Sequence, residues 1–118
     1  MPIERINPRR RLSQAVRHGD TVYIAGTVAD DTTADVKGQT DQILSKIDAL
    51  LAHVGVDKSH LLSATVWLAD VTTYDDMNAI WDAWVASGEA PARACVEAKL
   101  AGPEYKVEIA AIAALNRD

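Results

Sequence analysis

The sequence contains a single cysteine, Cys95, so the chain cannot form an internal disulfide and gives no reason to expect an oxidising compartment. It has no apolar run of membrane-spanning length and no apolar signal core after Met1. A Gly-rich phosphate loop, a His-x-x-x-His pattern and paired cysteines are also missing. We therefore expect a cytoplasmic protein with no membrane partner, and neither a structural metal nor a phosphate cofactor is indicated.

Positive charge is scarce as well. The formal net charge is −5, and the basic residues cluster only at Arg9, Arg10 and Arg11. Such a chain lacks the electrostatic footprint of a protein that binds a phosphate backbone, so we expect no nucleic-acid partner. With 118 residues, of which 48% are hydrophobic, the chain can bury one core. We predict a single domain over residues 1–118.

Hydrophobic periodicity predicts the order strand, strand, helix, strand, helix, strand, strand. The strands are expected at residues 13–17, 21–28, 61–68, 93–100 and 106–113. Apolar residues at helical spacing predict amphipathic helices over 36–54 and 74–87. The aromatic stripe of the second helix, from Tyr74 to Trp84, is interpreted as core. Residues 1–12, with Pro2 and Pro8, are expected to be irregular.

Each predicted helix has one apolar stripe and can therefore cover one face of one sheet. This pattern predicts an α+β fold, a two-layer sandwich with a mixed sheet and two helices packed on one face. The other sheet face would carry Tyr23 and either Thr65 or Trp67. Because such groups are too apolar for an uncovered face, we expect a homo-oligomer. Gly26, inside a predicted strand, indicates a bulge or a close approach to the backbone.

The residues with chemical potential lie near the end of the sequence. From Arg93 the chain alternates, with Arg93, Cys95, Glu97 and Lys99 on one face and apolar residues on the other. The next strand carries one carboxylate, Glu108, in an apolar run. Neighbouring strands that bring Arg93, Cys95 and Glu108 together could bind and process a small carboxylate.

Each of these residues also has a structural interpretation. Arg93 could pair with Glu97 or a cross-strand acid on the surface, an interaction that contributes little energy. Glu108 could be an interface carboxylate, and Cys95 a small buried hydrophobe. No histidine stands at a nearby strand position to activate a thiolate, so Cys95 is not expected to be a nucleophile.

The sequence resembles the RidA/YjgF family. Residues 92–98, Ala-Arg-Ala-Cys-Val-Glu-Ala, follow Pro91 and precede Lys-Val-Glu-Ile-Ala-Ala-Ile-Ala at 106–113. This combination is similar to the signature end of the reactive-intermediate (enamine/imine) deaminases, also labelled L-PSP endoribonucleases. The similarity covers nearly the whole chain, through Ala25-Gly26, Asp35-Val36 with Gln39 and Gln42, residues 64–68 and Met77-Asn78.

The resemblance implies a chorismate-mutase-like fold that assembles as a homotrimer with clefts at the subunit interfaces. It implies that Arg93 holds the carboxylate of a small substrate, a role that suits the planar guanidinium. It places Cys95 and Asn78 in or beside the cleft and makes Glu108 the residue that orients the attacking water. The implied reaction is hydrolysis of a 2-imino acid, or its enamine tautomer, to a 2-oxo acid and ammonia. No metal or organic cofactor is needed, because the imine is already electrophilic.

Two positions depart from the imine deaminases. Leu12 stands where they have a tyrosine, and Ala25 replaces a hydroxyl residue before Gly26. Both changes make that side of the cleft more apolar. Three hypotheses stay open: an imine hydrolase, a small-molecule-binding trimer or sister-subgroup member acting on another small molecule, and an endoribonuclease. The acidic charge argues against the last.

Overall fold

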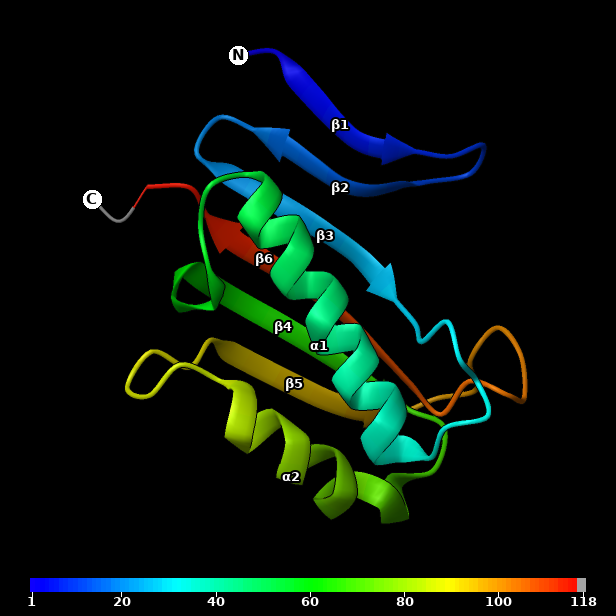
Figure 1. Cartoon of the computed structure of the whole chain (residues 1–118). Helices are drawn as coiled ribbons and strands as arrows, with labels where there is room; N and C mark the ends of the chain where they lie inside the picture. The colour runs from blue at the N-terminus through cyan, green and yellow to red at the C-terminus, as the bar shows by residue number, and fades with distance from the viewer. Residues whose placement is uncertain (117–118) are drawn as a thin grey trace.

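The computed structural model describes residues 1–116 as a two-layer α+β sandwich (Figure 1). Six strands form one sheet in the order β1-β2-β3-β6-β4-β5, in which β4 and β5 are parallel and the other neighbours antiparallel. The strands are β1 (Ile3–Pro8), β2 (Ser13–His18), β3 (Thr21–Thr27), β4 (Leu61–Leu68), β5 (Ala92–Glu97) and β6 (Val107–Ala114). The helices are α1 (Val36–His53) and α2 (Tyr74–Trp84), with short 3₁₀ turns η1 (Lys58–His60) and η2 (Val71–Thr73).

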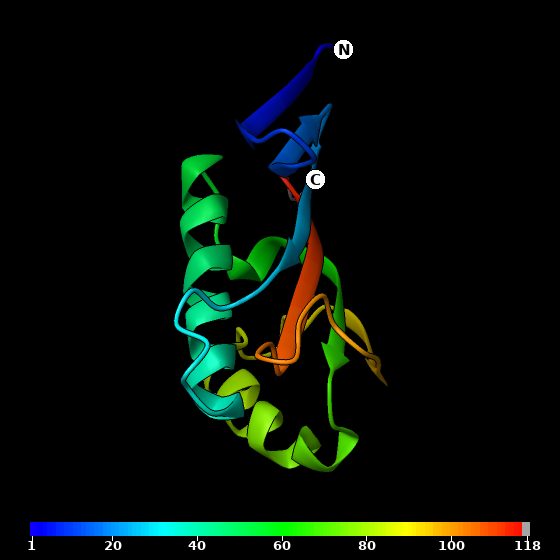
Figure 2. The same cartoon turned by 90° about the vertical axis from the view of Figure 1, so that its right-hand side faces the viewer.

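Both helices lie on one face of the sheet, as the turned view shows (Figure 2), so the predicted fold class is confirmed. Alternate residues of β6 are buried, in the period-two pattern of a strand. They pack below the apolar stripe of α1, which contributes Ile43, Leu44, Ile47 and Leu51 to the core. No helix within residues 1–116 is long and apolar enough to cross a membrane.

The N-terminal segment differs from the prediction, because residues 3–8 form the edge strand β1 instead of an irregular stretch. Ile6 is buried opposite Ala15 of β2 and adds an apolar residue to the core. Pro2 and Pro8 precede and end this strand. An edge strand leaves half of its N–H groups unpaired, so proline is tolerated there. The two prolines bound the strand and do not prevent it.

In β5 the polar face, and not the apolar one, is turned toward the helices. Arg93 and Cys95 pair with Ala64 and Val66 of β4, whose side chains are buried beneath the helices. Residues directly opposite each other in a sheet point to the same face, so the Arg93 face is turned toward the helix layer. The apolar residues Ala94 and Val96 lie on the uncovered face instead, where Val96 is 48% exposed.

The uncovered sheet face is apolar, as expected. Tyr23 is 47% exposed and pairs with Ile112 of β6. Trp67 of β4 pairs with Val96 on one side and Glu108 on the other. This face therefore presents aromatic and aliphatic side chains with a carboxylate among them.

A fully buried glutamine ties the start of β6 to the start of α1. Nε2 of Gln39 lies 3.1–3.2 Å from the carbonyl oxygens of Thr32, Ala34 and Glu104, and Oε1 accepts from the N–H of Lys106 at 3.0 Å. A buried amide that satisfies its polar atoms in this way fixes the backbone around it. It holds the segment that leads directly into Glu108.

Candidate functional site

Arg93 lies in a cage made by one side of α2. Its guanidinium carbon is 5.0 Å from the ring centre of Trp81 and 5.9 Å from that of Tyr74, both within cation–π range. Nη1 donates to Oδ1 of Asn78 at 2.8 Å and lies 3.9 Å from Sδ of Met77. Nη2 donates to the hydroxyl oxygen of Tyr74 at 3.2 Å. These four residues come from the first two turns of α2 and orient the guanidinium.

All of these partners are neutral. Among residues 1–116, no carboxylate contacts the Arg93 guanidinium. Glu97, the acid proposed as its surface partner, instead accepts a hydrogen bond from the N–H of Val71 at 2.9 Å. An arginine has five N–H donors, and this one uses only two on oxygen acceptors. The half-buried cation therefore keeps both charge and donors for an anion.

Cys95 lies two residues further along β5 on the same face and packs partly against the core. Burial raises the pKa of its thiol above the ordinary value, although the positive charge of Arg93 acts in the opposite direction. The protonated thiol is a weak nucleophile at neutral pH. The geometry agrees with a wall of the site and not with covalent catalysis.

Glu108 points to the other side of the sheet. It pairs with Trp67, whereas Arg93 shares the face of Ala64 and Ala111. Two strand spacings also separate the two residues, which is roughly 10 Å. The expectation that neighbouring strands bring Arg93, Cys95 and Glu108 together is therefore wrong within one chain.

Gly26 explains how the Glu108 carboxylate fits against β3. The register of β3 with β6 shifts between Ile24 and Thr27, which is the bulge that a strand glycine indicates. A Cβ added to Gly26 would collide with Oε2 of Glu108. Both interpretations of this glycine hold, since it sits in a bulge and allows a close approach.

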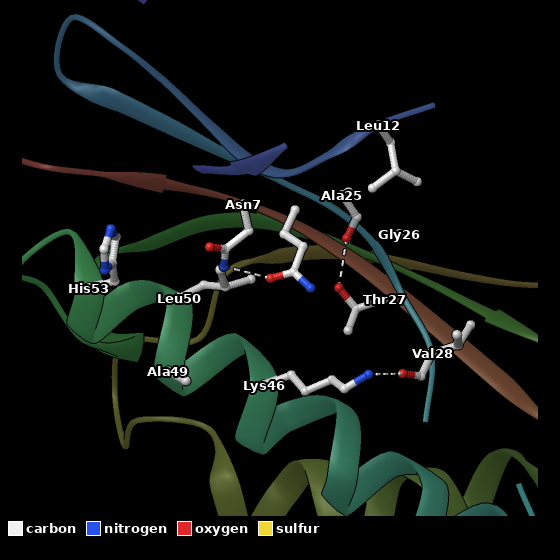
Figure 3. Close-up of a pocket in the computed structure, with 11 residues that line it drawn as sticks. Asn7, Leu12, Ala25, Gly26, Thr27, Val28, Lys46, Ala49, Leu50 and His53 are labelled. Atoms are coloured by element: carbon white, nitrogen blue, oxygen red, sulfur yellow. Dashed lines mark hydrogen bonds between the residues drawn. The ribbon is translucent and has the colours of Figure 1, made fainter. Parts of the chain in front are cut away.

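A pocket of about 400 Å³ lies at the other end of the sheet, between α1 and the first three strands (Figure 3). It brings together three of the predicted site residues, Leu12, Ala25 and Gly26. Sequence reasoning missed the rest of its lining, which includes Asn7, Gln14, Thr27, Lys46, Leu50 and His53.

The polar groups of this pocket are mostly engaged. Nζ of Lys46 donates to the carbonyl of Val28 at 2.8 Å and pairs with Asp30 at 2.7 Å, and Asn7 donates to Gln14 at 2.8 Å. Lys46 and His53 are seven residues apart, a spacing that places both on one helix face and is visible in the sequence. Asn7 could not be predicted as a pocket residue from the sequence, because the strand that carries it was not predicted.

Apart from Glu108, which lies on β6 in the middle of the sheet, the predicted site residues fall into two groups on opposite sides of the sheet. Arg93, Cys95 and Asn78 lie at the β5–α2 edge, and Leu12 and Ala25 lie beside β2 and β3. Four strand spacings separate β5 from β2, which is about 19 Å. A small ligand cannot contact both groups in a single chain.

The fold and this arrangement define a small α+β sandwich protein with a caged arginine at one sheet edge. The family model described as endoribonuclease L-PSP matches residues 2–115. A RutC family protein from Haemophilus ducreyi is 46% identical over 114 residues, 97% of each chain. The RutC family protein YoaB from Escherichia coli K12 is 45% identical over 115 residues, 98% of this chain and 100% of YoaB.

Solved structures agree with this assignment. A YjgF family member from Neisseria meningitidis is 42% identical, with a TM-score of 0.95 over 100% of this chain and 98% of the other. The chain therefore belongs to the YjgF/RidA family, to which the RutC and L-PSP descriptions also refer.

Proposed function

We propose that this protein hydrolyses reactive 2-imino acids, and their enamine tautomers, to 2-oxo acids and ammonia. The observation that carries the proposal is the Arg93 guanidinium, which is held by neutral groups and has donors left for a carboxylate. A guanidinium can grip a carboxylate through two parallel hydrogen bonds. The proposed setting is the cytoplasm.

In this mechanism Glu108 orients a water molecule that adds to the carbon of the C=N bond. The carboxylate accepts a proton from the water as the C–O bond forms, and proton return to nitrogen allows ammonia to leave. The Glu108 carboxylate lies against Gly26, and no hydrogen bond to it is formed within residues 1–116, which supports a role in holding a water molecule. Cys95 and Asn78 line the carboxylate end of the cleft.

The cleft requires two chains, because Arg93 and Glu108 face opposite sides of one sheet. A head-to-tail contact would join the β5–α2 edge of one subunit to the β1–β3 side of the next. A contact of this kind generates a ring when its rotation closes, and we propose the homotrimer that the family resemblance implies. The apolar uncovered face, with Tyr23 and Val96, would be buried inside the ring.

The apolar residues Leu12 and Ala25 support an apolar side chain on the substrate. They also favour the second candidate, a small-molecule-binding trimer or a sister-subgroup member that acts on a different small molecule. The endoribonuclease activity in the description of the family model has less support, because the net charge of −5 opposes binding of a phosphate backbone.

The test is a deaminase assay on freshly generated 2-iminobutanoate and 2-iminopropanoate, with release of 2-oxo acid and ammonia as readouts. Arg93→Lys keeps the charge but loses the planar fork, and we expect about a 100-fold loss of kcat/KM, the cost of about 2.7 kcal/mol. Arg17→Lys, on the exposed surface of β2, is the matched control and should keep full activity.

Equal rates for wild type and Arg93→Lys would contradict the carboxylate-binding role. Thermal stabilisation by 2-oxo acids without any turnover would favour the binding protein. An RNase activity that copurifies through several columns and disappears in Arg93→Ala would favour the endoribonuclease.

A further inference from the structure

We propose that the pocket between α1 and the first three strands is a second ligand site, which binds a small carboxylate with an apolar body. The site is complete within one chain, so it depends neither on the proposed function nor on assembly. Two amide side chains carry the inference, because Asn7 and Gln14 leave hydrogen-bond donors unused at the wall of a pocket whose described lining holds no carboxylate.

The pocket is separate from both halves of the proposed imine site. Glu108 is not among its lining residues, since it pairs with Trp67 on the face that the helices leave uncovered and approaches Gly26 from that side. Helix α1 covers the pocket on the opposite face of the sheet (Figure 3). At the far edge Arg93 has a wall of its own in Tyr74, which is 41% exposed, so the prediction that the whole aromatic stripe of α2 is core is wrong for Tyr74.

The size and the walls of the pocket suit a small amphipathic molecule. Its volume of about 400 Å³ lies within the range of small-molecule sites in proteins. Leu12, Ala49 and Leu50 supply apolar surface to the lining. These side chains can cover a short hydrocarbon body, so the polar lining groups decide which head group the ligand carries.

The amide pair determines which polar groups are free. Nδ2 of Asn7 donates to Oε1 of Gln14 at 2.8 Å, an interaction that Figure 3 marks with a dashed line. The two N–H groups on Nε2 of Gln14 have no acceptor within residues 1–116. An amide that is held by its oxygen presents its nitrogen as a donor, and turning it over would break the bond to Asn7.

The backbone of Asn7 supports a built arrangement. Its φ is 49°, and within residues 1–116 it is the only residue other than glycine with a positive φ. Asparagine tolerates this left-handed conformation better than most residues do. Such outliers persist where the surrounding structure holds them in place, often beside ligands. Here the outlier is the residue that orients the Gln14 amide.

The charges of the lining favour an anion. Among the lining residues that the structure describes, the ionisable side chains are Lys46 and His53. Lys46 is paired with Asp30, but the His53 ring makes no hydrogen bond within residues 1–116. The backbone carbonyl oxygens of Ala25 and Val28 already accept hydrogen bonds from side chains. The free groups are therefore mainly donors, which a carboxylate matches better than a cation does.

The experiment compares three probes of similar shape, hexanoate, hexanamide and hexylamine, by heteronuclear NMR titration. We expect hexanoate to bind most tightly, with a Kd of about 1 mM, as befits so small a ligand, and to shift the side-chain amide signals of Gln14. Hexylamine should leave these signals unchanged. Tighter binding of hexanamide or of hexylamine than of hexanoate would overturn the carboxylate assignment.

Two substitutions test the pocket directly. Gln14→Glu puts a carboxylate oxygen where the free donor was and leaves an oxygen for Asn7, so hexanoate affinity should fall at least about tenfold while hexylamine binding appears. Ala49→Phe fills the pocket from an exposed position of α1 and should abolish hexanoate binding, whereas Ala52→Phe makes the same change outside the lining and should not. Unchanged hexanoate binding in Ala49→Phe, or an unchanged preference in Gln14→Glu, would refute the site.

Arg93→Lys separates this site from the proposed function. Hexanoate should still shift the Gln14 signals in that variant, because the pocket and the arginine lie on opposite sides of the sheet. Loss of the shift with Arg93 would show that the pocket belongs to the arginine site and would refute a second site. If the wild type binds hexanoate in the pocket but does not hydrolyse imines, the proposed function fails and the second site stands.

Discussion

The two edges of the sheet are opposite in character. The β5–α2 edge holds one caged cation, Arg93, beside a helix whose exposed side carries Asp75, Asp76 and Asp82. The β1–β2 edge holds a pocket with the apolar residues Leu12 and Ala25, and its connecting turn carries Arg9, Arg10 and Arg11, all exposed. Figure 1 shows these edges as the gold and blue ends of the sheet.

The difference between these edges supports the proposal that each edge supplies half of a site. In the proposed function one edge binds the substrate carboxylate through Arg93, and the residue that activates water, Glu108, lies on the opposite face of the sheet. The other edge has the pocket and, against Gly26, the carboxylate of Glu108, and the lysine that lines this pocket, Lys46, is paired with Asp30. Their opposite charges would also favour contact between the edges of two copies.

The strongest test of this comparison mixes two inactive variants. We expect Arg93→Ala and Glu108→Gln to be inactive alone and to regain activity when unfolded together and refolded. Random assembly should restore about a quarter of wild-type activity, the share of interfaces where an intact Arg93 meets an intact Glu108. Native mass spectrometry verifies the mixed oligomers, and mixed oligomers without activity would mean that both residues act within one chain.

Gly26→Ala tests the Glu108 side alone. The added methyl group would displace the Glu108 carboxylate, so we expect at least a tenfold loss of kcat, on the order of a misplaced catalytic group. Because the displaced atoms end a flexible side chain, the free energy of unfolding should change by less than about 1 kcal/mol. In a Glu108→Gln background the substitution should cause no further loss of activity, and full activity of Gly26→Ala would oppose the role of Glu108.

Replacing Arg9, Arg10 and Arg11 by glutamine tests the charge contrast. We expect about a two- to fivefold weaker association of subunits at low salt, measured by sedimentation, since exposed ion pairs contribute little each. The difference should vanish near 0.5 M salt, where the Debye length is only about 4 Å. Lys37→Gln, which removes an exposed positive charge from α1 and leaves the β1–β3 side unchanged, serves as the control. An effect that is independent of salt would show that charge is not its cause.

The smallest effect concerns the thiol of Cys95, which reports on the Arg93 edge. Burial raises its pKa above the ordinary value of a cysteine thiol and Arg93 opposes the shift, so the pH midpoint of alkylation should lie above that of a free cysteine. Arg93→Gln removes the opposing charge, and its midpoint should move further upward. Iodoacetamide labelling across pH 7–11 gives the midpoint, which does not depend on how accessible the thiol is. A downward shift would contradict the contact between the two residues.

Much of the fold was predictable, because it depends on local periodicity. The alternation in β6 and the stripe of α1 each follow from a repeat that is visible in the sequence. The strand β1 was not predictable in this way. It has one buried residue, Ile6, and its prolines resemble strand breakers until its edge position is known. The pocket residue Asn7, which lies on β1, could not be predicted for the same reason.

The sequence by itself determined the α+β sandwich, the family and the residue types near Arg93, since these depend on patterns along the chain. Only the tertiary structure decided which face each side chain joins. The pairing of β5 with β4 turned Arg93 toward α2, and the pairing of β6 with β4 turned Glu108 away from it. The sequence shows which residues of a strand share a face. Which of the two faces turns toward the helices depends on the neighbouring strand and on the register of their pairing. Those contacts are long-range, and no repeat in the sequence encodes them.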